Sequence, residues 1–225
     1  MTDGPRPLPS PVAIDGPAAA GKTTIAAALA AEFGYAVLDT GMTYRAFTYE
    51  AIRRGVDDGD RDGCAKLAAS IDLVVAGGAI EVDGEDVTQH LRTPAVERRV
   101  SAYSALPAVR TAMVRIQREA GLRQPTIVVG RDIGTVVFPE APLKLFLTAT
   151  TEERARRRSR QAGHWGVLQG VDEAEADIQH RDSIDSSRQV SPTRAAADAV
   201  VIDTSKLSLD DVIEEAKRLV RAWNA

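Results

Sequence analysis

A glycine-rich segment near the N-terminus matches the phosphate-binding pattern G-x-x-x-x-G-K-[ST]. It reads Gly16-Pro17-Ala18-Ala19-Ala20-Gly21-Lys22-Thr23. In such a loop the backbone N–H groups surround a phosphate, Lys22 neutralises its charge, and the Thr23 hydroxyl is a ligand for Mg²⁺. An apolar run precedes the loop and an Ala-rich helical segment follows it, a context that a plain Gly-rich turn does not need. The pattern predicts a site for a nucleoside triphosphate with Mg²⁺.

Two further polar motifs follow apolar runs. Thr40 begins a segment that includes Arg45, and this arginine in the first helical turns suits the clamping of a monophosphate. Taken alone, Arg45 is equally compatible with an exposed helix surface. Arg131 and Asp132 cap a later apolar run, where two charges are costly unless they meet a ligand or each other. The pair therefore belongs to a site or is purely structural.

An arginine-rich segment later in the chain admits two interpretations. In a helix, Arg154, Arg157 and Arg158 share one face, while Glu152 and Glu153 can pair with arginines four residues on. Such pairing is typical of a solvated charged face. Beside a phosphate loop, the same arginines also suit a mobile lid that closes over the triphosphate.

A second cluster lies further along the chain. Arg181, Asp185 and Arg188 recur at i, i+4 and i+7, which places them on one helix face. They can form a surface salt-bridge ladder, which contributes little to stability. They also suit recognition of a phosphate and of sugar hydroxyl groups, which a carboxylate can accept.

These motifs need a sheet that brings them together. Short apolar runs predict buried strands at Val12–Ile14, Ala36–Leu38, Ile127–Val129, Leu143–Leu147 and Ala199–Ile202. Helices are predicted at Lys22–Phe33, Thr43–Arg54, Pro107–Ala120, Thr151–Gln161, Glu173–His180 and Leu209–Ala222. Because strands and helices alternate, we expect an α/β fold with a five-stranded parallel sheet and helices on both faces. Ligands of such sheets bind beyond the carboxyl ends of the strands, where the polar motifs fall. The segment Ile71–Val87 predicts a small antiparallel insertion.

The composition of the chain excludes several classes of protein and of site. The 225 residues carry 28 Lys and Arg against 32 Asp and Glu, a net charge of −4 that argues against a nucleic-acid coat protein. Arginine supplies 23 of the 28, which indicates either a compositional habit or several sites of bidentate anion recognition. The single Cys64 allows neither an intrachain disulfide nor a cysteine-based zinc site. No apolar run is long enough for a transmembrane helix, and residues 1–11 indicate a flexible Pro-rich tail.

Together the motifs make the chain resemble the bacterial cytidylate kinases, which are P-loop nucleoside monophosphate kinases. The segments that carry the resemblance are Ile14–Thr24, Leu38–Arg45, Gly130–Pro139, Arg181–Pro192 and Ala197–Ser205. The loop departs from the family at Ala18-Ala19-Ala20 and at Thr23, where relatives often carry a further Gly or Ser. The resemblance implies a P-loop kinase domain over residues 12–225. Within it we expect a monophosphate-binding region at about 40–110, a β insertion at about 70–98 and a helical lid at about 154–172.

The resemblance also implies an activity and its site residues. It implies transfer of the γ-phosphoryl group of ATP to CMP or dCMP, with ATP bound by the loop from Gly16 to Thr24. Around the acceptor phosphate it places Thr40, Arg45, Arg131 and Arg188. It implies that Arg181 and Asp185 contact the sugar, and that Ser101, Arg110 and Asp132 contact the cytosine.

The chemistry expected of such a site needs no general base, because the acceptor phosphate is already ionised near neutral pH. We expect Lys22, Arg131, Arg188 and the lid arginines to stabilise the anionic transition state. Asp132 either reads the base or orders Mg²⁺. Two alternatives stay open: a small P-loop kinase with another acceptor, and a nucleotide-binding regulator without turnover. We also expect a cytoplasmic monomer that binds neither nucleic acid nor membrane.

Overall fold

The phosphate loop extends from a sheet of five parallel strands in the order β2-β6-β1-β7-β8. The strands are β1 (Val12–Asp15), β2 (Ala36–Asp39), β6 (Thr126–Val129), β7 (Leu143–Thr148) and β8 (Val200–Asp203). In the central strand, Val12 pairs with Ile127 on one side and with Leu143 on the other. This computed structural model describes residues 8–164, 170–188 and 191–223. The predicted five-stranded parallel sheet is confirmed.

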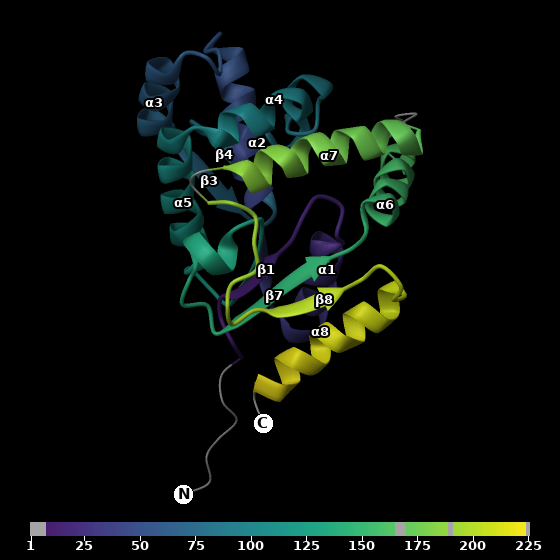
Figure 1. The fold of residues 1–225 in the computed structure, drawn as a ribbon. Coiled ribbons are helices and arrows are strands. Elements are labelled where there is room, and N and C mark those ends of the chain that lie inside the picture. Colours follow the sequence, from purple (N-terminus) through teal and green to yellow (C-terminus); the bar gives the residue numbers. More distant parts are fainter. Residues whose placement is uncertain (1–7, 165–169, 189–190, 224–225) are drawn as a thin grey trace, which may run out of the picture.

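Helices cover both faces of this sheet because neighbouring strand residues point to opposite sides. Val12 packs in the core cluster that contains residues of α1 (Lys22–Phe33) and α8 (Leu209–Trp223). Its neighbour Ala13 packs in a different cluster, against which residues of α5 (Pro107–Gly121) lie. The strands are apolar on both faces of the sheet because a layer of helices packs against each face (Figure 1).

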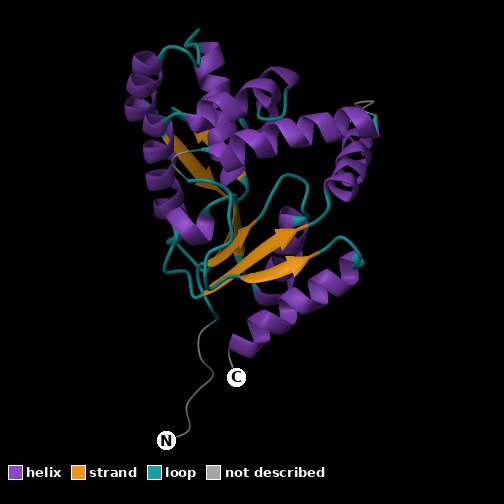
Figure 2. Cartoon of the chain, viewed as in Figure 1, coloured by secondary structure: helices purple, strands orange, loops and turns teal. Residues whose placement is uncertain are grey.

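A second core belongs to the segment between β2 and β6. Its elements are α2 (Thr40–Arg53), α3 (Arg61–Ser70), β3 (Leu73–Ala76), β4 (Ala79–Val82), β5 (Glu85–Asp86), α4 (Pro94–Ala105) and α5. The strands form the predicted small antiparallel sheet, which Figure 2 shows apart from the parallel one. Helices α3 and α4 were not predicted from the sequence. Their buried faces include small or polar side chains such as Cys64, Ala68 and Ser104, so the apolar periodicity that marks a helix is weak.

Two helices follow β7 and lie on the side of the molecule to which the strand ends point (Figure 1). They are α6 (Thr151–His164) and α7 (Val171–Ser187). Helix α7 packs against α6 and against α4, and is longer than the predicted Glu173–His180. Residues 165–169 of the expected lid and 1–7 of the expected tail lie outside the described residues.

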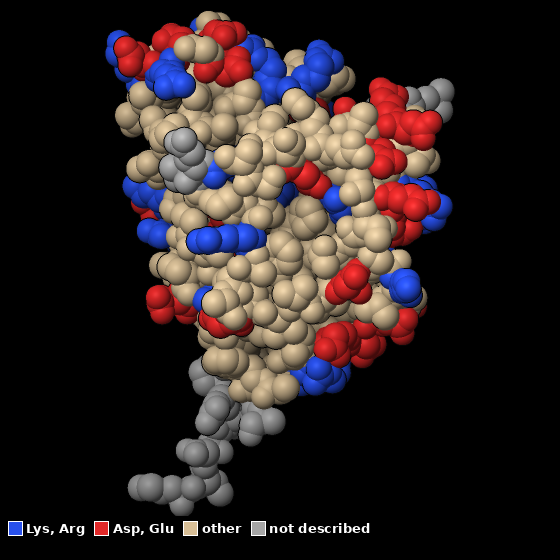
Figure 3. All heavy atoms as spheres, viewed as in Figure 1, with Lys and Arg blue, Asp and Glu red and all other residues tan. Residues whose placement is uncertain are grey.

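The surface carries charges of both signs. On the face drawn in Figure 3, acidic and basic side chains gather at the upper end and along one edge, and the middle is mostly uncharged. Among the described residues, no helix is long and apolar enough to cross a membrane.

Candidate active site

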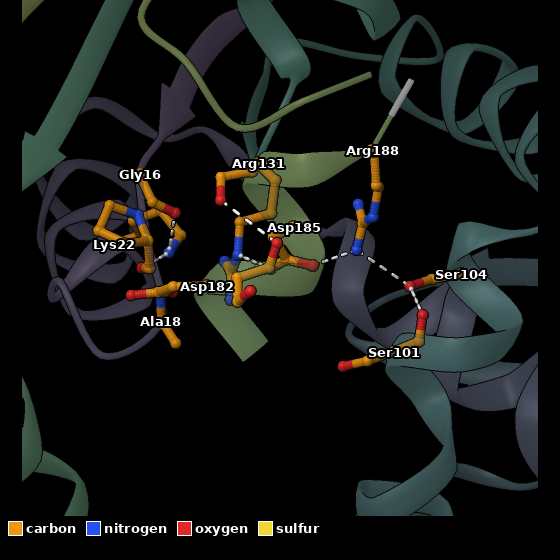
Figure 4. A network of polar contacts seen from close by, with 12 residues as sticks. Gly16, Ala18, Lys22, Ser101, Ser104, Arg131, Asp182, Asp185 and Arg188 are labelled. Atoms are coloured by element: carbon orange, nitrogen blue, oxygen red, sulfur yellow. Dashed lines mark hydrogen bonds and ion pairs between the residues drawn. The ribbon is translucent and has the colours of Figure 1, made fainter. Parts of the chain in front are cut away.

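The phosphate loop connects β1 to α1 and needs glycine for its shape. Gly16 and Gly21 have φ angles of 145° and 92°, and a Cβ on Gly16 would lie 2.1 Å from the carbonyl oxygen of Leu147. Lys22 Nζ donates to two carbonyl oxygens of the loop at 2.7 and 2.8 Å (Figure 4). Burial, followed by the charge of Arg131, lowers the pKa of Lys22 well below its usual value. An anion in the loop would offset both effects and favour the ammonium form.

Asp15, the last residue of β1, links this loop to the turn that follows β6. Its buried carboxylate accepts hydrogen bonds from the backbone N–H groups of Ile133 and Gly134, both at 2.7 Å. Burial raises the pKa of Asp15 to about 6, although the two N–H donors oppose the rise. These bonds fix the start of a π-helical turn, and so hold the backbone that carries Arg131 and Asp132 beside the loop.

A cavity of about 670 Å³ extends from the phosphate loop to α4 and α5. Loop residues from Ala18 to Thr24 form one end of its wall. The nine side chains that the family resemblance implied as acceptor contacts all line the same cavity. They are Thr40, Arg45, Ser101, Arg110, Arg131, Asp132, Arg181, Asp185 and Arg188. Residues up to 148 positions apart in the chain thus converge opposite the phosphate loop. They lie on four helices, on the turn after β6 and, for Arg188, directly after the end of α7.

Asp185 pairs with two of these arginines (Figure 4). Its carboxylate accepts from Arg131 Nε at 3.0 Å and from the guanidinium of Arg188. Arg188 also donates to the Ser104 hydroxyl at 3.2 Å, and that hydroxyl donates to the carbonyl oxygen of Ser101 at 3.0 Å. Asp185 is 6% exposed, so the pairs lie in a poorly hydrated part of the cavity.

Arg110 and Asp132 form a second pair, and both are almost fully buried. The guanidinium of Arg110 lies 5.4 Å from the ring centre of Tyr44, and burial raises the pKa of that phenol to about 12. The Nε groups of Arg110 and Arg188 are buried donors that find no acceptor among the described residues. Buried donors are rarely left without an acceptor, so these two indicate a ligand with oxygen or nitrogen acceptors in the cavity.

Three residues of this site were not predicted from the sequence. Tyr44 and Ser104 lie one turn or less from predicted residues, and only their burial in the cavity wall sets them apart. Glu97 on α4 accepts from Arg45 at 2.8 Å and from Arg181 at 2.5 Å. Burial alone would raise the pKa of Glu97, but the ion pairs with these arginines prevail and lower it to about 2.

The predicted lid arginines take different positions. Arg157 and Arg158 line the cavity, whereas Arg154 is not part of its described lining. Arg154 is 6% exposed and donates to the Ala18 carbonyl of the phosphate loop at 3.3 Å and to the Asp182 carboxylate. Arg157 donates to the hydroxyl and carbonyl oxygens of Thr204 at 2.9 and 2.8 Å. Arg154 therefore joins α6 and α7 to the loop, while Arg157 and Arg158 line the cavity.

The loop also offers a position for a metal ion. Thr23 lies in the first turn of α1, lines the cavity and is exposed. Within the described ranges, no three His, Cys, Asp or Glu side chains are grouped to hold a metal. Mg²⁺ commonly binds with one or two protein ligands and keeps waters and substrate phosphate oxygens for the rest. The single hydroxyl fits that mode.

The fold and the site define a P-loop kinase: a parallel sheet carries the phosphate loop, and a charged wall lies opposite that loop in the same cavity. The cytidylate kinase family model matches residues 12–222. The chain belongs to the cytidylate kinase family.

Individual relatives agree with this assignment. The chain is 46% identical to the cytidylate kinase of Mycobacterium avium (strain 104), with 93% of this chain and 94% of that one covered. It is 44% identical to that of Solibacter usitatus (strain Ellin6076), with 94% and 92% covered. A bifunctional pantoate ligase/cytidylate kinase of Synechococcus sp. (strain JA-3-3Ab) is 45% identical over 97% of this chain, which spans only 41% of that longer protein. The crystal structure of TT1252 from Thermus thermophilus shares the fold, at a TM-score of 0.52 and 21% identity, with 97% and 100% covered.

Proposed function

We propose that the protein transfers the γ-phosphoryl group of ATP to CMP or dCMP, which yields ADP and CDP or dCDP. The observation that carries the proposal is the convergence of nine acceptor-type side chains on one cavity opposite the phosphate loop. Family membership supports the choice of acceptor. A cavity with two phosphate-binding regions suits two nucleotides that meet phosphate to phosphate.

The acceptor would lie along the wall formed by α2, α4, α5 and α7. Its phosphate would meet Thr40, Arg45, Arg131 and Arg188, its sugar Arg181 and Asp185, and its cytosine Ser101, Arg110 and Asp132. Cytosine presents an amino donor and ring acceptors, which a carboxylate and an arginine can satisfy. Because Asp132 is buried against Arg110, we assign it to base recognition rather than to metal binding.

The catalytic contribution would come from alignment and positive charge. Lys22, Arg131 and Arg188 surround the region between the loop and the acceptor wall, and Arg157 and Arg158 approach from α6. These cations stabilise charge that spreads over the transferring phosphoryl group, and the acceptor oxygen needs no base. Mg²⁺, when bound at Thr23 with ATP, would neutralise phosphate charge.

The remaining expectations belong to the same proposal. Residues 40–110 would form the monophosphate-binding region, residues 154–172 the lid, and the chain would act on small nucleotides as a cytoplasmic monomer. The lid assignment is supported by the contacts of α6 and α7 with the loop and with α4. Light scattering on a size-exclusion column tests the oligomeric state, and a dimer would contradict that part.

A coupled assay of ADP release tests the activity. Each of CMP, dCMP, UMP, AMP and GMP is offered with Mg²⁺-ATP. We expect CMP and dCMP to be used at least about tenfold better than the others, because a wrong base leaves a buried polar group unpaired at a cost of about 1–3 kcal/mol. Equal or better use of another acceptor would favour a different small-molecule kinase. ATP binding without ADP release with any acceptor would favour a nucleotide-binding regulator.

A further inference from the structure

Glu97 on α4 gathers arginines from three other helices. Its carboxylate accepts from Arg45 Nε of α2 at 2.8 Å, from Arg181 of α7 at 2.5 Å and from Arg158 of α6 at 3.4 Å. Its backbone carbonyl accepts from Arg181 as well, at 2.9 Å. The side chain is 17% exposed, so these pairs are poorly screened by solvent. One carboxylate therefore joins the monophosphate-binding region to both lid helices.

The place of Glu97 relative to the cavity determines what the carboxylate can do. Arg45, Arg158 and Arg181 line the cavity, whereas Glu97 is absent from its described lining. The carboxylate lies behind the arginines and takes no space from a ligand. A carboxylate inside the cavity would compete with an incoming phosphate, but one behind the arginines orients their guanidinium groups toward it. Three cations against one carboxylate still leave a surplus of positive charge for an anion.

The rest of the acceptor wall is built in the same way. Each of its five arginines pairs with one of three carboxylates. The pairs are Arg45 and Arg181 with Glu97, Arg131 and Arg188 with Asp185, and Arg110 with Asp132. Two of the three carboxylates face the cavity, and Glu97 supplies the third from behind. The pattern gives Glu97 a role that its sequence context did not indicate.

We propose that Glu97 is a positioning residue of the acceptor site, which holds Arg45 and Arg181 in place for the acceptor phosphate and sugar. The inference rests on the proposed function. Without the carboxylate, three long cationic side chains repel one another and lose their fixed geometry, so the acceptor must order them on binding. Within the described residues, Glu97 reaches α6 only through Arg158, at 3.4 Å, and makes no contact with the phosphate loop, so ATP binding should depend on it less than acceptor binding does.

The substitution Glu97→Gln removes the charge and keeps the shape. We expect the KM for CMP to rise about tenfold or more, the size of effect that loss of charge-assisted pairs produces. The KM for ATP and the kcat at saturating CMP should change several-fold less than the KM for CMP, because the pair of Glu97 with Arg158 is longer, at 3.4 Å, than its pairs with Arg45 and Arg181. Glu97→Asp keeps the charge on a shorter side chain, and should recover part of the loss in CMP affinity.

Glu50 offers a matched control. Its carboxylate is fully buried and also pairs with two arginines, Arg53 and Arg54, but it is not part of the described cavity lining. The Glu50→Gln variant, where it folds, should keep the wild-type KM for CMP, because the substitution changes only the free energy of unfolding. If Glu97→Gln binds CMP as tightly as the wild type or more tightly, the inference is wrong. If the wild type itself neither binds nor phosphorylates CMP, the proposed function is wrong. The role of Glu97 in acceptor binding is then wrong as well.

Discussion

At the scale of single residues, the site depends on positive charges held in poorly hydrated positions. Lys22 is enclosed by carbonyl oxygens of its own loop, and burial and Arg131 lower its pKa. Such a lysine is poorly stabilised until an anion arrives, and so interacts strongly with phosphate. The proposed transfer needs no general base and would depend on this cation and its neighbours.

The substitution Lys22→Ala tests that dependence. We expect turnover to fall by about a hundredfold or more, because a charge that stabilises the transition state is lost. The melting temperature should hold or rise, since burial of the ammonium is costly without phosphate. Lys66→Ala, an exposed change on α3, serves as the control and should leave turnover unaltered. Wild-type turnover in Lys22→Ala would contradict the role given to the phosphate loop.

At the scale of elements, helices α6 and α7 are joined to the phosphate loop by a largely buried contact. Arg154 of α6 reaches the Ala18 carbonyl and the Asp182 carboxylate of α7, and Asp182 in turn accepts from the Ala18 N–H at 3.4 Å. The loop, α6 and α7 therefore share one polar junction. If these helices act as the proposed lid, any displacement of them would reach the loop through this junction.

The substitution Arg154→Ala should weaken this junction. We expect the free energy of unfolding to fall by about 2–3 kcal/mol, because Asp182 loses its partner in a half-buried position. Arg156 on the same helix pairs with Glu152 at 2.6 Å, but both side chains are more than half exposed. Arg156→Ala should therefore cost less than about 1 kcal/mol. Equal losses in denaturant titrations of the two variants would show that burial of Arg154 is unimportant.

At the scale of the whole molecule, the sequence predicted the sheet and its covering helices better than the ion pairs and hydrogen bonds of the site. The phosphate loop and the strands have local signals, so Gly16, Lys22 and the apolar runs sufficed for the parallel sheet. Glu97 has no such signal, because its arginine partners lie 52, 61 and 84 residues away and meet it only after folding. Arg154 and Arg157 look alike in a charged helix, and packing alone separates their positions.

The dependence of stability on pH is a property of the whole molecule that Glu97 should influence. Its pKa is about 2 in the folded protein against an ordinary 4.5, so the unfolded state binds more protons between these values. Its contribution is complete above about pH 4.5, amounts to about 3 kcal/mol, and is lost as the pH falls toward 2. The unfolding free energies of wild type and Glu97→Gln should therefore converge on acidification. Parallel profiles from pH 7 to pH 3 would contradict the strong pairing.

In the proposed function, the cavity brings the γ-phosphate of ATP to the phosphate of a cytidine nucleotide. An experiment with γ-³²P-ATP, supplied with Mg²⁺ and CMP, follows the labelled phosphate directly after the products are separated by chromatography. We expect the label to move into the β-phosphate of CDP, with little inorganic phosphate. Label that appears only as inorganic phosphate, or that stays in ATP, would contradict it.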